Sequence, residues 1–437
     1  MRRRRDLSRR EFIRVAGTSA AGLALLGPLS TTAPAAVAEG LKDTGLRFGG
    51  ASGDVTPSGT IVWLRAEGKG GVSVQYGKEP ALKEFATTPP VLATKESDFT
   101  AKIMIDGLEP QTTYYYRGAM AGKKPGPIHR FVTAPKPNDT ANVQFAFSGD
   151  SRERFKPFTI MDSIRAMRPD FFLHLGDTIY ADVDGVASRL PQYWAKYAAN
   201  RSDLPTQRLL SETSTYVTWD DHEVTNDYHP ANPLAPIGRR AFFDYWPIRQ
   251  DPKESHRLYR SFRWGKAAEL FILDTRQYRD PISGTILGRQ QKEWFLESLS
   301  SSTAWFKFIA TSVPFSSPHS DKWGGFPEER DEVLKFLTAK KIGGVIFIAA
   351  DVHYAAVSRV SGGSGLKEFI VGPLAAPMGR ASGTAKRFEF FSNDSYNYGM
   401  VRVHAKADPP YTEIEILDQD NKLLHKSRVD SSPWGFK

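Results

Sequence analysis

Between residues 41 and 135 the chain alternates short runs of β-favouring residues with turns. The runs GTIVWLRAE, DFTAKIMIDGL and TTYYYRGAM are separated by glycine, proline or charged residues. Short strands divided by frequent turns are typical of a small β-sandwich. We therefore expect residues 39–135 to form an all-β N-terminal domain, with the polar segment APKPNDTA, residues 134–141, as the linker that follows it.

After the linker the hydrophobic pattern changes. Apolar runs that read as buried strands, among them NVQFAFSGD, DFFLHLGD and GGVIFIAADVH, alternate with helical patterns such as LGRQQKEWFLESL and EERDEVLKFLTAKK. This alternation predicts an α/β domain whose strands are largely buried. The last part, including MVRVHA and YTEIEILDQ, is rich in strands again, so we expect a mixed sheet within residues 136–437.

The charge of the chain is concentrated at its beginning. The 437 residues carry a formal net charge of +9, but residues 1–38 hold seven of the 58 basic and two of the 49 acidic residues, so the remainder carries +4. A body of this size and charge does not require a polyanionic partner. The charge therefore implies no nucleic-acid partner.

Residues 1–38 have the order of an export signal. The basic segment MRRRRDLSRREFIR precedes the weakly apolar VAGTSAAGLALLGPL, and Ala36-Val37-Ala38 is a small-residue cleavage site. The pair Arg9-Arg10 resembles the twin-arginine signal. The resemblance implies export by the twin-arginine machinery to the periplasm or the outside, without a stable membrane anchor. The alternative is a basic disordered arm.

The chain has no cysteine. This excludes thiolate nucleophiles, zinc fingers and iron–sulfur centres. An exported chain without disulfides depends on its core and on any bound metal for its stability.

Acidic and imidazole groups follow the predicted strands. In open α/β sheets ligands bind at the carboxyl ends of the strands, so these groups are expected to converge. Converging carboxylates require raised pKa values or a cation, and oxygen donors without sulfur favour hard metals such as Ca²⁺, Mg²⁺, Mn²⁺ or ferric iron. The groups are Asp150, Asp177, the run Asp220-Asp221-His222, and Asp351 with His353.

Each of these residues also has a simpler interpretation. Asp150 and Asp177 suit helix N-caps, and Tyr180 suits a packed aromatic. The carboxylates of 220–227 suit a solvated loop or a structural calcium site. Asp351 and His353 suit a turn with a surface histidine.

Several motifs together resemble known families. The segment LEPQTTY, residues 108–114, is similar to the fibronectin type III signature whose tyrosine forms a tyrosine corner. GDTIY, residues 176–180, matches the metallophosphoesterase motif in the version of purple acid phosphatases. The order HLGDTIYAD, VTWDDHEVTND, LDTRQYRD, LGRQQKEWF, ADVHYAAVS is similar to the PhoD-like alkaline phosphatases and phosphodiesterases. The resemblance implies an α/β metallophosphatase fold of sandwiched sheets flanked by helices, after a fibronectin type III or Ig-like sandwich.

The resemblance also implies a two-metal site of Fe³⁺ and Ca²⁺. Asp177 would bridge the metals, and Asp220, Glu223 and Asp227 would orient the ligands. Asp150 stands where family members carry cysteine, which leaves the metal identity open, and Ala350 replaces a glycine of the last motif. No clear counterpart exists for a lone histidine ligand, for which His319 is the nearest candidate. The metal ligands implied are Asp150, Asp177, Tyr180, Asp221, Asp351 and His353.

The implied activity is the hydrolysis of phosphomonoesters, phosphodiesters or both. His222 would protonate the leaving group or bind phosphate, and Arg152 and Arg240 are further catalytic candidates. Arg239 and Arg276 are candidates for substrate binding, with a solvated helix face and a loop salt bridge as their respective alternatives. Two other functions remain open: a phospholipase D-like or polymer-specific phosphodiesterase, and a non-enzymatic calcium-binding surface protein.

Overall fold

The computed structural model describes residues 40–360, 362, 365–380 and 388–431. The predicted export signal at 1–38 lies outside these residues. Within them, no helix is both long and apolar enough to cross a bilayer.

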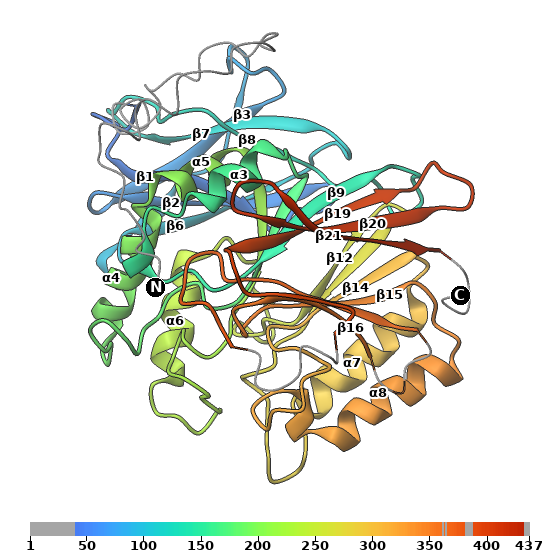
Figure 1. The fold of residues 1–437 in the computed structure, drawn as a ribbon. Coiled ribbons are helices and arrows are strands. Elements are labelled where there is room, and N and C mark those ends of the chain that lie inside the picture. Colours follow the sequence, from blue (N-terminus) through green and yellow to red (C-terminus); the bar gives the residue numbers. More distant parts are fainter. Residues whose placement is uncertain (1–39, 361, 363–364, 381–387, 432–437) are drawn as a thin grey trace, which may run out of the picture.

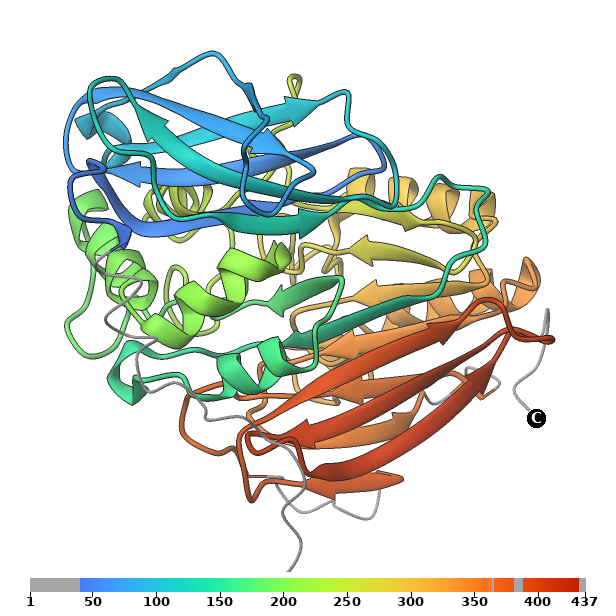
Figure 2. The same cartoon turned by 90° about the horizontal axis from the view of Figure 1, so that it is seen from above.

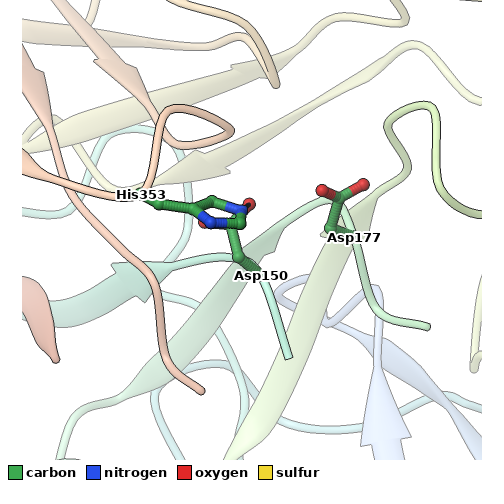
Figure 3. A group of neighbouring side chains, drawn as sticks. All are labelled: Asp150, Asp177 and His353. Carbon is green, nitrogen blue, oxygen red and sulfur yellow. Dashed lines mark ion pairs between the residues drawn. The ribbon is translucent and has the colours of Figure 1, made fainter. Parts of the chain in front are cut away.

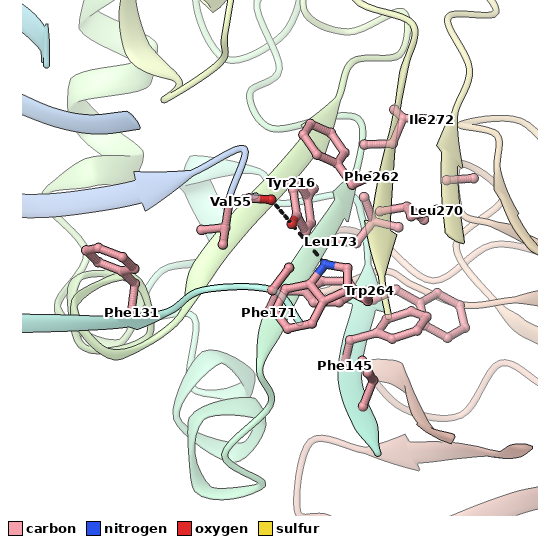
Figure 4. Packing of buried hydrophobic residues seen from close by; sticks show 14 of the residues in the cluster. Val55, Phe131, Phe145, Phe171, Leu173, Tyr216, Phe262, Trp264, Leu270 and Ile272 are labelled. Atoms are coloured by element: carbon pink, nitrogen blue, oxygen red, sulfur yellow. Dashed lines mark hydrogen bonds between the residues drawn. The ribbon is translucent and has the colours of Figure 1, made fainter. Parts of the chain in front are cut away.

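Two large β-sheets lie face to face at the centre of the molecule (Figures 1 and 2). Aromatic and aliphatic side chains from both sheets interdigitate between them, with Phe145 edge-on to Phe308 at 5.0 Å between ring centroids. Figure 4 shows this core, in which the Trp264 indole N–H donates to the Tyr216 hydroxyl, which in turn donates to the Val55 carbonyl. The nine-stranded sheet has the order β21 (Leu423–Asp430), β20 (Tyr411–Asp418), β19 (Asn397–His404), β9 (Val143–Ser148), β10 (Phe171–Leu175), β11 (Ser214–Thr218), β1 (Leu46–Gly53), β2 (Gly59–Ala66), β6 (Thr100–Asp106).

The second large sheet has seven strands. Its middle strands pair in parallel, and β14 and β15 are buried along their whole length because helices cover the outer face and the other sheet covers the inner one. The order is β12 (Arg260–Trp264), β13 (Ala268–Ile272), β14 (Phe306–Ala310), β15 (Val345–Ala349), β17 (Lys367–Ile370), β16 (Ala355–Arg359), β18 (Phe390–Ser392).

Helices cover the outer faces of both sheets. Helices α7 (Gly288–Ser301) and α8 (Pro327–Ala339) lie on the seven-stranded sheet (Figure 1), where their apolar faces pack against Phe271 and Phe347. The nine-stranded sheet is covered by α3 (Ile160–Ala166), α4 (Leu190–Arg201), α5 (Leu204–Glu212) and α6 (Ala235–Tyr245). Short 3₁₀ turns are η1 (Lys95–Ser97), η2 (Glu153–Phe155) and η3 (Trp323–Gly325). The molecule therefore has the predicted mixed α/β class, with two facing sheets between helices.

The N-terminal all-β region fits a small β-sandwich. One of its sheets contains β4 (Ala86–Thr87), β3 (Gly70–Gly77), β7 (Thr113–Met120) and β8 (His129–Val132), with β5 (Val91–Ala93) paired to β3. The tyrosine corner is present, since the Tyr114 hydroxyl accepts a hydrogen bond from the Glu109 N–H at 3.0 Å. The other three strands extend the large nine-stranded sheet, because β1 pairs in parallel with β11 at Gly53 and Thr215.

Candidate metal centre

Four strands end at one place between the two sheets. Asp150 and Asp177 follow the neighbouring parallel strands β9 and β10, the run 220–222 follows β11, and Asp351 follows β15 of the other sheet. The predicted convergence of strand ends is confirmed. It brings side chains from both sheets to a common site.

The backbone of this site is left-handed at its key positions. The φ angles are 67° at Asp150, 52° at Asp177, 70° at Asp351 and 57° at His353. A non-glycine residue in this region stores strain that the surrounding fold has to offset, and such residues concentrate at functional sites. The backbone thus directs these side chains inward at a cost in stability.

Asp150, Asp177 and His353 form the first of the side-chain groups (Figure 3). One ligand atom from each lies within 4.8 Å of the others. Asp150 is 1% exposed, and within the described residues neither of its carboxylate oxygens accepts a hydrogen bond. Gly372 leaves space for this carboxylate, because a Cβ atom at position 372 would lie 2.4 Å from Asp150 Oδ2. A buried carboxylate without a donor is the expected signature of a cation ligand.

The tautomer of His353 is fixed by its surroundings. Its Nδ1 lies 2.7 Å from the Pro377 carbonyl, which accepts only, so Nδ1 carries the proton. Nε2 is then the ring atom that faces the site, 2.9 Å from the Tyr180 hydroxyl and 3.5 Å from Asp150 Oδ1. Burial, followed by the field of Asp177, raises the pKa of Tyr180 well above its ordinary value. A bound cation would reverse that effect and favour the phenolate.

His222 joins Asp177 and Asp221 in a second group. Its Nδ1 lies 2.7 Å from Asp182 Oδ1, and its ring packs against the Tyr180 ring with 4.3 Å between centroids and a tilt of 30°. Burial disfavours the imidazolium, but the hydrogen bond to Asp182 and the charge of Asp221 raise the pKa of His222 to about 9. Asp182 leaves Nε2 as the ring atom that is free to exchange a proton within the site.

Asp177 lies between these two groups. Burial, and then the charges of Asp221, Asp220 and Asp150, raise the pKa of Asp177 well above its ordinary value. Its Oδ1 accepts a long hydrogen bond, at 3.3 Å, from the His222 backbone N–H. Because both groups include it, Asp177 has the position of a bridging ligand.

Glu223 ties two of the converging loops together. One of its oxygens accepts from the Thr178 N–H and hydroxyl, both at 2.6 Å, and the other from the Asp220 N–H at 2.9 Å and the Asp177 N–H at 3.3 Å. The side chain is completely buried. This is the orienting position that the resemblance implied for Glu223.

Asp220 does not offer a free ligand. Arg276 donates to both of its oxygens, at 2.7 and 3.1 Å, and the Ser312 hydroxyl donates at 2.7 Å. Arg276 is itself completely buried and also pairs with Asp321 at 3.0 Å. The prediction that Arg276 binds substrate is therefore not supported by its position, and its alternative role, holding the loop by salt bridges, matches the structure.

Asp321 and Lys322 were not singled out from the sequence. Both lie on the loop after β14, where Lys322 Nζ donates to Asp351 Oδ1 and lies 3.4 Å from Asp321 Oδ2. His319 on the same loop is exposed, and its Nδ1 accepts from the Asp321 N–H. The one hint of this in the sequence was that no clear counterpart existed for a lone histidine ligand. The loop that carries His319 supplies the ammonium group of Lys322 to the site instead.

The remaining arginine candidates fall into two sets. Arg152 lies at the edge of the site, with its guanidinium 5.9 Å from the Tyr180 ring centroid and hydrogen-bonded to Asp184 at 2.7 Å. Arg239 and Arg240 lie on α6, where Arg239 donates to Gln277 at 3.0 Å. Arg240 pairs with Asp244 at 2.9 Å and donates to the Glu96 carbonyl. The structure does not bring Arg239 and Arg240 to the carboxylates, in agreement with their interpretation as helix-face charges.

The donors fit a hard cation. Within the described residues, two further groups could hold an ion, Asp220 with Asp221 and Asp351, and Asp221 with Asp227 and Asp321. Carboxylates, a phenol and a few imidazoles are ligands for Ca²⁺, Mg²⁺, Mn²⁺ or Fe³⁺. Among the predicted ligands, Asp150, Asp177, Tyr180, Asp221, Asp351 and His353 all lie in or beside these groups.

Comparisons with known proteins agree with this geometry. A family model for the PhoD-like phosphatase matches residues 145–407, and that for its N-terminal domain matches residues 31–135. Alkaline phosphatase D of Bacillus subtilis (strain 168) is 27% identical over 424 residues, covering 80% of this chain and 72% of the relative.

Solved structures show the same fold. The structure of PhoD superposes with a TM-score of 0.78 at 21% identity, covering 89% of this chain and 92% of that one. Purple acid phosphatase PPD1 from yellow lupin seeds superposes with a TM-score of 0.68 at 13% identity, covering 89% of this chain and 74% of that one.

Proposed function

The chain belongs to the PhoD-like phosphatase family and is a hydrolase of phosphoric esters, and we propose that it cleaves phosphomonoesters, phosphodiesters or both in a metal-dependent reaction. The observation that carries the metal dependence is Asp150, a buried carboxylate that accepts no hydrogen bond from the described residues and lies beside Asp177 and His353. Family membership argues against the non-enzymatic calcium-binding protein.

Asp150, Asp177, Tyr180 and His353 are the proposed ligands of Fe³⁺, since a phenolate oxygen suits that ion. Asp177, Asp221 and Asp351 are the proposed ligands of Ca²⁺. When bound, the two ions would supply positive charge to the phosphate oxygens and acidify a water molecule.

His222 is the proposed proton donor to the leaving oxygen. Asp182 accepts a hydrogen bond from the Nδ1–H group and so fixes the ring. Nε2 is then the atom that gives up a proton to the leaving group. The carboxylate of Asp182 favours the imidazolium that this role requires. The Tyr180 ring packed against the imidazole restricts it to this orientation.

Arg152 is the proposed phosphate-binding side chain. Its guanidinium is already oriented by Asp184, with a hydrogen bond at 2.7 Å from Nε, and it lies over the Tyr180 ring at 5.9 Å from the centroid. Among the described residues the terminal nitrogens of Arg152 donate no hydrogen bond, and two parallel N–H groups of a guanidinium suit a phosphoryl group.

We further propose that the protein acts in the periplasm or outside the cell after export by the twin-arginine pathway. The support is the order of basic, apolar and small-residue segments in residues 1–38. Replacing Arg9 and Arg10 with lysine is expected to retain the protein in the cytoplasmic fraction, and export of that variant would refute the assignment.

The activity is tested by comparing wild type with Asp177→Asn on 4-nitrophenyl phosphate and bis(4-nitrophenyl) phosphate, with metal content measured in parallel. We expect turnover to fall at least 100-fold with loss of bound metal. Asp420→Asn, a change of an exposed aspartate, is the matched control and should keep both. Wild-type turnover by Asp177→Asn would refute the mechanism, and a panel of lipid and polymer diesters distinguishes a general phosphatase from a specialised phosphodiesterase.

A further inference from the structure

Lys322 is an ammonium group inside the candidate metal centre. Its side chain is 12% exposed, its Nζ donates to Asp351 Oδ1, and Asp321 Oδ2 lies 3.4 Å away. The other oxygen of Asp351 is buried and has no hydrogen-bond partner among the described residues. Asp351 therefore offers one oxygen to the site while Lys322 holds the other.

The two halves of the centre differ in their cations. One half is made by Asp150, Asp177 and His353. Among the described residues, no lysine or arginine forms an ion pair with either of its carboxylates. The half around Asp221 and Asp351 contains two, because Lys322 pairs with Asp351, and Arg276 lies 3.5 Å from Asp221 Oδ2.

A cation bound between Asp221 and Asp351 would lie close to the ammonium group. Like charges at that separation repel strongly in a buried site. Lys322 has a flexible four-carbon stem and a second acceptor, Asp321, beside it. Asp321 is held in place by Arg276 at 3.0 Å and Arg279 at 2.6 Å, so an ammonium group that leaves Asp351 keeps a fixed anionic partner.

We propose that Lys322 is a built-in competitor for the second metal ion: the ion enters the Asp221–Asp351 half only as the ammonium group moves from Asp351 toward Asp321. The two halves consequently bind cations with different strength. The Asp150–Asp177–His353 half fills first and tightly, and the second half is the exchangeable one. This inference rests on the proposed metal dependence and adds the residue that sets the affinity of the second site.

Direct metal binding tests the proposal without reference to turnover. The metal-free full chain is titrated with Mn²⁺ at pH 7.5, and free Mn²⁺ is measured by electron paramagnetic resonance. Wild type is expected to bind one ion tightly and a second at least tenfold more weakly. In Lys322→Met, which keeps an unbranched chain without the charge, the second ion should bind at least tenfold more tightly than in wild type, with the first unchanged within threefold.

Three variants complete the experiment. Lys322→Arg keeps the charge and should keep the second site weak. Lys307→Met removes another buried lysine, one that donates to the carbonyl oxygens of Ala304 and Gly343, and should leave both sites unchanged. Lys322→Gln serves as the neutral variant if the methionine variant does not fold.

The outcomes separate the two proposals. A neutral variant whose second site is unchanged or weaker overturns the competitor role of Lys322. Absence of any tight Mn²⁺ site in wild type overturns the metal-dependent function as well. Tight sites in a protein without esterase activity contradict only the proposed reaction.

Discussion

Replacing Glu223 with glutamine is expected to loosen the two loops that carry the proposed bridging ligand. All four partners of the Glu223 carboxylate are donors: the N–H groups of Asp177, Thr178 and Asp220, and the Thr178 hydroxyl. A glutamine has nearly the same shape, so no cavity forms. The NH₂ group of the glutamine, however, is a donor, and it has to face the donor groups that one oxygen of Glu223 accepts from.

The magnitude follows from counting those donors. With the amide nitrogen toward Thr178, the hydroxyl turns to accept, and the Thr178 N–H loses its acceptor, at a cost of about 2 kcal/mol. The N–H groups of Asp177 and Asp220 exchange a charged acceptor for a neutral one, at about 0.5–1 kcal/mol each. The expected loss in the free energy of unfolding is about 3–4 kcal/mol. For the 437-residue chain the entropy of unfolding is about 0.9 kcal/mol/K, so the melting temperature should fall by about 4 °C.

The assay is thermal unfolding followed by circular dichroism at pH 8. Burial raises the pKa of Glu223 to about 7, so the wild-type carboxylate is largely ionised at that pH. Glu297→Gln on the exposed face of α7 is the control and should change the melting temperature by less than about 1 °C. If Glu223→Gln also shifts it by less than about 1 °C, the four hydrogen bonds do not hold the loops and the reasoning is wrong.

Three further outcomes are expected. Burial lowers the pKa of His129 to about 4, so as pH falls below about 6.5 this histidine is protonated in the unfolded chain before it is protonated in the folded one. The free energy of unfolding should therefore fall by about 2 kcal/mol between pH 7 and pH 5. Unfolding of His129→Gln, measured at both pH values, should not show this loss. Gly372→Ala places a Cβ against Asp150 and should weaken metal binding, measured by equilibrium dialysis, at least tenfold, whereas Gly107→Ala, also at positive φ but with open space around it, should keep the metal and lose only about 1 kcal/mol of stability. Arg276→Met leaves Asp220 buried without its ion-pair partner, whereas Asp321 keeps Arg279, and the change should destabilise the protein by about 3–5 kcal/mol in thermal unfolding; a change under 1 kcal/mol would contradict a structural role for this arginine.

The strand ends were predictable because the rule that places them is local. An apolar run followed by an acidic residue marks the end of a buried strand, and parallel strands bring such ends together. Asp150, Asp177, Asp221 and Asp351 were found in this way. His222 and His353 belong to the same strand ends, and their expected roles came from the resemblance to the PhoD-like family.

The partners of these residues were harder to predict, because they depend on distances across the fold. Lys322 comes from a loop with no regular pattern, and only the packing of β14 against β15 brings it to Asp351. Asp182 was part of a recognised motif, but its hydrogen bond to His222 is not encoded by spacing. A buried arginine and a surface arginine look the same in a sequence, so the enclosure of Arg276 became visible only in the structure.

The parallel pairing of β1 with β11 has a consequence for how this protein can be divided. A shortened chain that begins at the linker would lack β1, which joins β11 at Gly53 and Thr215, and β11 would then be the edge strand of the sheet. Such an edge recruits further strands and promotes aggregation. The first strand therefore acts as a cap for the sheet that bears the catalytic loops, and a recombinant catalytic fragment would need residues 46–106 as well.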